Sequence, residues 1–292
     1  DRPTPGNNAT SPSPLWWDYT RDYGTKDRRL SLIGGLDYEI IDGLKAQVQV
    51  SNYSHLSNYH YFEKAHEFSG LRSTKASQSQ LDRSKVDALL KYDANWSQDH
   101  TLSLLGGYSY QQTDFNSFSA TVNGASSDKV PTLSAGPNKT GADEDLWQQV
   151  LIGYFGRANY AYKQKYLLMG TFRYDGSSLF AKENRWGFFP GVSAGWVVSQ
   201  EPFMRDQQTV SYLKFRTSYG QTGNNSIGLY DALGKFTTDI RYDGAAGIYA
   251  STMPNRDLTW ETSTQFDLGF DLALFNNRIN IQADYFNKIT KN

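Results

Sequence analysis

Alternation of apolar and polar residues is the feature that most constrains how this chain can fold. Between residues 30 and 41, one set of alternate positions is mostly Leu, Tyr and Ile, whereas the other set includes Asp37 and Glu39. The alternation resumes after Asp42-Gly43, which is a strong hairpin signal. Successive side chains of a β-strand point to opposite faces. The pattern therefore predicts strands that have an apolar environment on one face and an aqueous environment on the other.

Ten segments of the chain carry this pattern, and most are about ten residues or longer, the length that a tilted strand needs to cross a bilayer. Strands of soluble proteins are typically about five or six residues long. We therefore predict an all-β fold, a transmembrane antiparallel β-barrel with about ten strands in this chain. The segments are residues 30–41, 44–51, 84–96, 101–111, 146–162, 166–175, 187–199, 212–221, 258–274 and 279–288.

The connections between these segments alternate between short and long. Short ones lie at 42–43, 97–100, 163–165 and 275–278, and long ones at 54–83, 112–145, 176–186 and 222–257, with an intermediate link at 200–211. Short turns on one side and long loops on the other are typical of outer-membrane barrels, as are aromatic girdles. Aromatic residues reach 15% although the mean hydropathy is −0.62. The sequence therefore predicts an outer-membrane location in a Gram-negative bacterium.

Ten strands are few for a barrel of this kind. We expect residues 1–29 to be an extended loop segment and residues 30–292 to be a partial barrel, an interior to C-terminal segment of a larger one. Transporters with 22 strands and a plugged lumen are a known class. The chain has no cysteine, so a disulfide framework is excluded, and its net charge of −1 gives no basis for nucleic-acid binding.

No arrangement of side chains predicts an enzyme, a cofactor or a metal site. Residues 191–195 match G-x-S-x-G, but the alternation continues through them and no histidine follows, so we interpret the match as accidental. His55, His60 and His66 match no ligand spacing. The acidic run at 143–145 lacks the spacing of a calcium loop, and a solvated turn is the preferred interpretation.

Two sets of residues are candidates for contacts. Charges on the wet face are expected mainly to pair with one another or to contact a plug: Asp37, Glu39, Lys45, Asp87, Lys91, Asp93, Arg157, Arg173, Asp175, Lys214, Arg216, Asp267 and Asp271. Aromatic residues of the expected loops are better candidates for binding a substrate or a partner, because exposed rings stack on sugars or hold apolar peptide side chains. They are Trp16, Trp17, Tyr59, Tyr61, Phe62, Phe115, Phe118, Tyr230 and Phe236.

Four stretches resemble the SusC/RagA family of TonB-dependent outer-membrane transporters. They are PLWWDYTRDYGTKDRRLSLIGGLDYEI, GRANYAYKQKYLLMGTFRYDGSSLFAKENRWGFFPGVSAGWVVSQEPFM, YLKFRTSYGQTGNN and DLTWETSTQFDLGFDLALFNNRINIQADYFNK. The resemblance implies a plugged 22-stranded barrel that imports glycans or oligopeptides. It also implies two protein partners: TonB, contacted through a segment outside this chain, and a SusD-like surface lipoprotein that forms a lid.

Two other functions remain open from the sequence. A passive outer-membrane porin would share the alternation and the girdles, but not the four stretches. A secreted β-rich carbohydrate-binding protein would have shorter strands and faces free of charge. Neither the transported nutrient nor the oligomeric state follows from the sequence.

Overall fold

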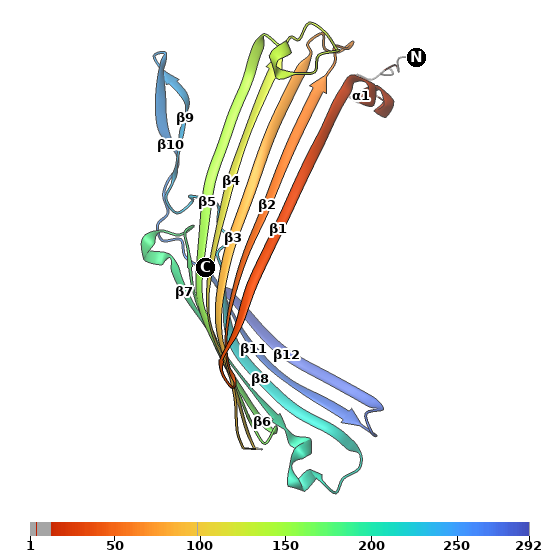
Figure 1. Ribbon diagram of the computed structural model, residues 1–292, viewed down its shortest axis with the longest axis vertical. Coiled ribbons are helices and arrows are strands. Elements are labelled where there is room, and N and C mark those ends of the chain that lie inside the picture. Colours follow the sequence, from red (N-terminus) through yellow and green to blue (C-terminus); the bar gives the residue numbers. More distant parts are fainter. Residues whose placement is uncertain (1–3, 5–12, 98, 292) are drawn as a thin grey trace. The chain divides into compact units, whose positions relative to one another are not determined.

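The computed structural model describes Thr4, residues 13–97 and residues 99–291. Ten antiparallel strands form one sheet in the order β1-β2-β3-β4-β5-β6-β7-β8-β11-β12 (Figure 1). Neighbours in this sheet follow one another along the chain, except that β9 and β10 intervene between β8 and β11. The strands are β1 Arg21–Ile41, β2 Leu44–Glu63, β3 Ser73–Ser97, β4 His100–Asn123, β5 Asn138–Tyr162, β6 Tyr166–Ser177, β7 Trp186–Val197, β8 Val210–Asn224, β11 Glu261–Leu274 and β12 Ile279–Lys291. The predicted all-β barrel fold with about ten strands is confirmed.

A few short elements lie outside this sheet. Strands β9 (Lys235–Tyr242) and β10 (Ala245–Thr252) pair only with each other, as a hairpin in the connection between β8 and β11. Helix α1 (Pro14–Thr20) precedes β1, and four single-turn 3₁₀ helices occupy connections: η1 Leu133–Ala135, η2 Lys182–Asn184, η3 Val198–Gln200 and η4 Pro202–Met204. No helix in the described part of the chain is long and apolar enough to span a membrane.

The register of the strands keeps the two faces of the sheet separate. Between β8 and β11, Phe215 lies opposite Phe270 and Tyr219 opposite Phe266, while Ser218 on the other face lies opposite Asp267. The apolar row continues into β12, where Tyr285 lies opposite Leu268 of β11. A slip of one residue would exchange the two faces. The register therefore preserves the apolar and polar faces that the sequence predicts.

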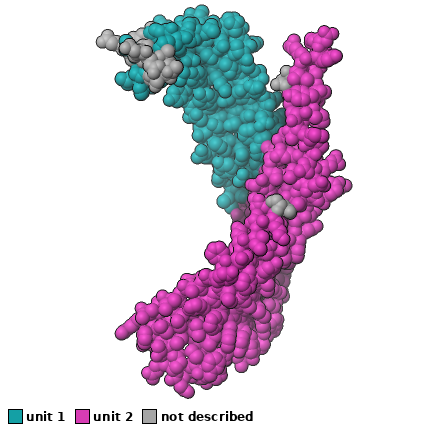
Figure 2. Space-filling view, turned by 180° about the vertical axis from the view of Figure 1, so that it is seen from behind, with its two compact units in different colours: residues 1–33, 51–84, 112–148 teal, residues 34–50, 85–111, 149–292 magenta. Residues whose placement is uncertain are grey.

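The chain divides into two compact units (Figure 2). Unit 1 comprises residues 1–33, 51–84 and 112–148, and unit 2 comprises residues 34–50, 85–111 and 149–292. Strands β1 to β5 contribute residues to both units, whereas β6, β7, β8, β11 and β12 belong to unit 2 alone. The first five strands are the long ones, with 20 to 25 residues each.

The prediction of long loops at 54–83 and 112–145 is wrong for much of their length. Residues 54–63, 73–83, 112–123 and 138–145 are strand, which leaves loops only at 64–72 and 124–137. The reason is physical: these strand ends carry polar residues on both faces, with aromatic residues such as Phe62, Phe115 and Phe118 among them. The regular alternation that marks a membrane wall therefore stops, although backbone pairing continues. The expected extended segment 1–29 likewise contains α1 and the first nine residues of β1.

Unit 1 has a small core around α1 and the loop at 64–72. Trp16 is completely buried and packs edge-on against His66 and Phe68, with ring centroids at 4.8 and 5.3 Å. Ser13 caps α1 by accepting a hydrogen bond from the Trp16 N–H. The His66 ring accepts the N–H groups of Phe68 and Ser69 at Nδ1, so its Nε2–H donates to Glu63. The Trp16 indole N–H also donates to Glu67 at 3.3 Å, so this bond and the ring packing hold the helix against the loop.

Unit 2 has its own cluster where the long connections leave the sheet. Phe180, Phe189 and Trp260 are buried together, and the indole N–H of Trp260 donates to the Arg185 carbonyl at 2.9 Å. At the opposite strand ends the turns are tight. Gly43 has φ +77°, and a Cβ there would collide with the Asp93 carbonyl. The Asp42-Gly43 hairpin turn predicted from the sequence is confirmed, and it requires glycine.

Candidate functional site

The polar face of unit 2 carries a connected set of charged side chains. Arg216 on β8 lies between Asp271 on β11 and Asp284 on β12, with nitrogen–oxygen distances of 3.4 and 2.7 Å. The Ser218 hydroxyl donates to Asp267 at 2.8 Å. Gly269 lies directly opposite Arg216, and a Cβ at this position would collide with Asp284. The glycine thus gives the guanidinium room to reach both carboxylates.

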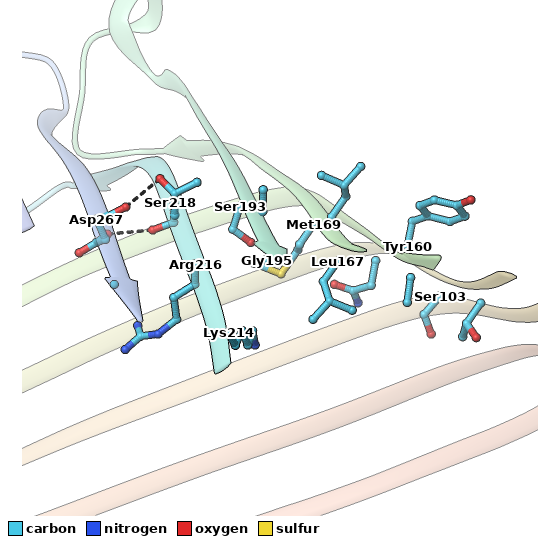
Figure 3. Close-up of a pocket in the computed structure, with 17 residues that line it drawn as sticks. Ser103, Tyr160, Leu167, Met169, Ser193, Gly195, Lys214, Arg216, Ser218 and Asp267 are labelled. Atoms are coloured by element: carbon cyan, nitrogen blue, oxygen red, sulfur yellow. Dashed lines mark hydrogen bonds between the residues drawn. The ribbon is translucent and has the colours of Figure 1, made fainter. Parts of the chain in front are cut away.

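A hollow of about 480 Å³ opens on this face beside the charged set (Figure 3). Its floor is made by small residues on β7 and β11, such as Ser193, Gly195 and Gly269, with Leu167 and Met169 of β6 along one side. Lys214 and Arg216 border it on β8. The Lys214 ammonium has no ion-pair partner among residues 13–97 and 99–291. The hollow therefore combines a floor of small residues, an apolar side and a cation without an ion-pair partner among the described residues.

A second hollow, of about 760 Å³, lies along the same face. Arg173 donates two hydrogen bonds to Asp175, at 3.0 and 2.9 Å, and its guanidinium lies 5.2 Å from the Phe155 ring. Gly153 faces this pair, and a Cβ there would meet Arg173 at 3.1 Å. Arg157 also lines the hollow, and it forms no ion pair within the described residues.

The charges predicted on the wet face therefore fall into two groups. Several pair within the sheet, as expected: Arg173 with Asp175, Arg216 with Asp271, and Lys91 with the Gln47 amide oxygen at 2.9 Å. Asp87 pairs with Lys85, a residue that the sequence analysis did not select. Asp37, Glu39, Lys45, Arg157 and Lys214 have no ion-pair partner in the described part of the chain. These five remain candidates for contacts with a molecule in the lumen.

Several of the aromatic candidates do not lie in the loops where the sequence placed them. Trp16 and Trp17 belong to α1; Tyr59, Tyr61 and Phe62 lie on β2; and Phe115 and Phe118 lie on β4, so none of these seven is in a loop. Trp16 and Phe62 are 0% and 1% exposed, which leaves no surface for a ligand. Tyr230 lies in a turn and Phe236 on β9, and both are exposed.

The structure brings together only a few of these rings. Trp16 packs against Trp17, and Arg21 lies 3.5 Å above the Trp17 ring. Phe115 stacks on Trp147 of β5, with centroids 5.1 Å apart and planes at 19°. Trp147 was not predicted as a candidate from the sequence, although it points to the same face of β5 as the polar residues Gln149 and Arg157.

Aromatic girdles form on the apolar face of unit 2. Near the long connections, Tyr154 contacts Tyr108 and Trp186, and Trp186 stacks on Tyr174 at 4.8 Å. Near the short turns, Glu201 accepts hydrogen bonds from the Tyr166 hydroxyl at 2.6 Å and the Trp196 indole at 3.0 Å. These two bonds, Tyr166 first, hold the pKa of Glu201 below its ordinary value.

Three histidines and the G-x-S-x-G match were considered above as possible sites, and the structure accounts for each of them. His55 contacts Asp27 at 3.2 Å, His60 the Pro131 carbonyl at 2.8 Å, and His66 Glu63, so the three do not converge on one point. Ser193 of the G-x-S-x-G match lies inside β7, where it lines the first hollow. A nucleophile elbow needs a strand-to-helix turn. Unbroken strand at this position supports the interpretation that the match is accidental.

Residues 1–292 match the family model described as "TonB dependent receptor-like, beta-barrel". The chain belongs to this family. It is 40% identical over 192 residues to TonB-dependent receptor P3 of Formosa agariphila, a match that covers 64% of this chain and 19% of that protein. It is 37% identical over 152 residues to TonB-dependent receptor SusC of Bacteroides thetaiotaomicron, covering 48% of this chain and 15% of SusC. It is therefore an outer-membrane protein, as predicted.

The fold also matches that of the RagAB peptide transporter, with a TM-score of 0.90 at 23% identity, over 96% of this chain and 32% of that one. The predicted resemblance to the SusC/RagA class is confirmed. The chain spans between 15% and 21% of the length of the curated relatives that it matches. Those relatives are named as receptors.

Proposed function

We propose that this chain is part of a transporter that imports large nutrients, glycans or oligopeptides, across the outer membrane with energy delivered through TonB. The observation that carries the proposal is the family match over residues 1–292. The polar face supports it, because Lys214 and Arg157 border hollows without an ion-pair partner among the described residues. Side chains of this kind can contact a plug or a passing substrate.

A SusD-like surface lipoprotein is the partner that we propose for the long connections. The β9–β10 hairpin is the best candidate contact, because Phe236 and Tyr242 are 69% and 83% exposed. A two-stranded hairpin alone is only marginally stable in water, and aromatic residues are enriched at interface cores. Packing against a partner protein would bury these rings and stabilise the hairpin.

The transport proposal is tested with the complete gene in its native host. Deletion should abolish growth on one glycan or peptide nutrient, and a plasmid copy should restore it. Removal of TonB should have the same effect as deletion of the transporter. Uptake that persists without TonB, together with open conductance of the purified protein in planar bilayers, would identify a passive porin instead.

The lid contact is tested by replacing residues 235–252 with a short Gly-Ser linker. We expect the barrel to assemble, while co-purification of the lipoprotein and uptake both fall. A Gly-Ser linker in place of residues 205–208, which are mostly exposed in the connection between β7 and β8, is the control. Unchanged co-purification in the hairpin variant would show that the hairpin is not the docking surface.

A further inference from the structure

Phe115 and Trp147 form a stacked aromatic pair in unit 1, on neighbouring strands β4 and β5. Both rings are half-buried, so they are neither a closed core nor fully solvated. Phe115 lies in the part of β4 where the apolar alternation has stopped, next to Asp114, and Trp147 lies at the end of the alternating part of β5, next to Gln148. Aromatic rings at such a position need an explanation other than contact with lipid.

The side-chain contacts fix the face on which the pair lies. Gln148 donates to Asp114 at 2.7 Å, so these two residues share one face of the sheet. Phe115 directly follows Asp114, and Trp147 directly precedes Gln148. Both rings therefore point to the opposite face of the sheet. Thr113 shares their face and accepts a hydrogen bond from Arg83 of β3 at 3.3 Å. Trp147 and Arg157 both occupy odd-numbered positions of β5, so their side chains point to the same face. That face is the polar one.

Polar groups without partners lie next to the rings. In the described part of the chain, the Trp147 indole N–H has no hydrogen-bond acceptor, and the carboxylates of Asp143 and Asp145 have no hydrogen-bond donor or ion-pair partner. Asp145 and Asp143 are two and four residues before Trp147, so they share its face. An aromatic surface, a free N–H donor and two free carboxylate acceptors therefore occur together.

The sheet excludes one common way of binding a peptide. An extended peptide gains most of its affinity by adding a strand to an open edge, but β4 and β5 are both interior strands with neighbours on each side. Recognition here must use side chains. A sugar ring offers an apolar C–H face to an aromatic ring, and its hydroxyls can both accept from an N–H and donate to carboxylates.

We propose that Phe115, Trp147 and Asp145 form a saccharide-binding subsite on the polar side of strands β4 and β5. The subsite rests on the proposed import function, of which it would be one binding step for a neutral oligosaccharide. Trp147 and Phe115 stack on the sugar ring, the Trp147 N–H donates to a hydroxyl or ring oxygen, and Asp145 accepts from hydroxyls.

The test uses the complete protein, purified in detergent, and isothermal titration calorimetry. The probes are maltohexaose, mannohexaose and xylohexaose, with a pool of ten-residue peptides as the competing class. The variants are Trp147→Ala, Trp147→Phe and Asp145→Asn, with Leu146→Ala as the control, because Leu146 is adjacent and exposed on the opposite face. Heat-modifiable electrophoretic mobility verifies that each variant has a folded barrel.

We expect at least one hexasaccharide to bind. Trp147→Ala should weaken that binding by about tenfold or more, since an aromatic contact contributes both buried area and ring geometry. Trp147→Phe and Asp145→Asn should have smaller effects, and Leu146→Ala should remain within about twofold of wild type.

Three results would overturn the subsite: hexasaccharide binding that Trp147→Ala leaves unchanged, binding of peptides only, or binding of no probe. Nutrient uptake separates this failure from failure of the proposed function. If wild-type cells import their nutrient through TonB while Trp147→Ala leaves hexasaccharide affinity unchanged, only the subsite is wrong. If wild-type cells show no TonB-dependent uptake, the import function is wrong whatever the calorimetry shows.

Discussion

Strands β1 to β5 contribute to both units, and their outward side chains differ between the two. In unit 2 the outward row of β3 is Val86, Ala88, Leu90, Tyr92, Ala94 and Trp96, whereas in unit 1 it is Ala76, Gln78, Gln80 and Asp82. On β4 the row changes from Leu102, Leu104, Gly106 and Tyr108 to Gln112, Asp114 and Asn116, with the exposed Phe118 next in the row. Contact with lipid explains the apolar outward side chains in unit 2, and contact with water explains the polar ones in unit 1.

The difference shows that strand length and membrane-spanning length are separate quantities. Strand β3 has 25 residues, but its apolar outward row covers only residues 86–96. A tilted strand needs about 9–11 residues to cross a bilayer. The remainder continues because each strand still has neighbours that satisfy its backbone groups.

The largest effect is expected for Trp16→Ala, which removes the fully buried ring of unit 1. Loss of a buried aromatic side chain typically costs about 3–5 kcal/mol. The substitution should weaken the packing of α1 against the loop at 64–72 and leave unit 2 folded. Hydrogen exchange should rise in residues 14–20 and 64–69 and stay unchanged in β6 to β8. Equal changes in both regions would mean that the units are not independent.

Val48→Arg and Asn58→Arg compare outward positions of the same strand, β2, in unit 2 and in unit 1. Val48→Arg should lower the free energy of unfolding by about 2–4 kcal/mol if it lies near the bilayer midplane. Asn58→Arg should change it by less than about 0.5 kcal/mol, as for an ordinary surface substitution. Urea unfolding in phospholipid vesicles measures both, and Gln49→Arg on the polar face is the control. Similar losses at positions 48 and 58 would contradict the assigned boundary of the lipid-facing row.

Gly106 and Gly107 are neighbours on β4 that point to opposite faces. A Cβ at Gly107 would collide with Phe155 and lie 2.8 Å from Leu89, whereas Gly106 has nothing within 4 Å. Gly107→Ala should therefore destabilise the barrel by about 1–3 kcal/mol through overpacking. Gly106→Ala, which faces open space, should be neutral within about 0.5 kcal/mol. Thermal unfolding of the purified protein measures the difference, and the reverse order would show that the assigned faces are exchanged.

The smallest effect on stability is expected from protonation of Glu201 at low pH. Its pKa is lowered by the hydrogen bonds from Tyr166 and Trp196, so it stabilises the fold above the ordinary carboxyl pKa of 4.5 and loses this contribution as pH falls through its own lower pKa. The melting temperature of wild type should drop over that range, and Glu201→Gln should show a shallower drop. Asp128→Asn in unit 1 is the comparison, because a hydrogen bond from Arg72 lowers the pKa of Asp128 in a loop of that unit. If the melting temperatures of wild type and Glu201→Gln fall in parallel as the pH is lowered, Glu201 is not the titrating group.

The sequence could predict the parts of the fold that lipid constrains. The predicted segments 84–96 and 101–111 coincide with the lipid-facing rows of β3 and β4, because apolar side chains must alternate there. The continuations of these strands were missed, since water imposes no such alternation on their side chains. The same limit applies to the candidate site. Phe115 was selected as a loop residue, and its stacking partner Trp147 was missed, because contacts between neighbouring strands depend on register.

The polar ends of β1 to β5 also have a consequence for assembly. An outer-membrane protein reaches the bilayer from the periplasm, and long connections end up on the far side. Strand ends such as Gln78, Gln80 and Asp82 must therefore pass the hydrocarbon region before they reach water. Each unpaired backbone group would cost several kcal/mol during that passage. The first five strands must therefore cross already paired with their neighbours or inside a sheltered channel.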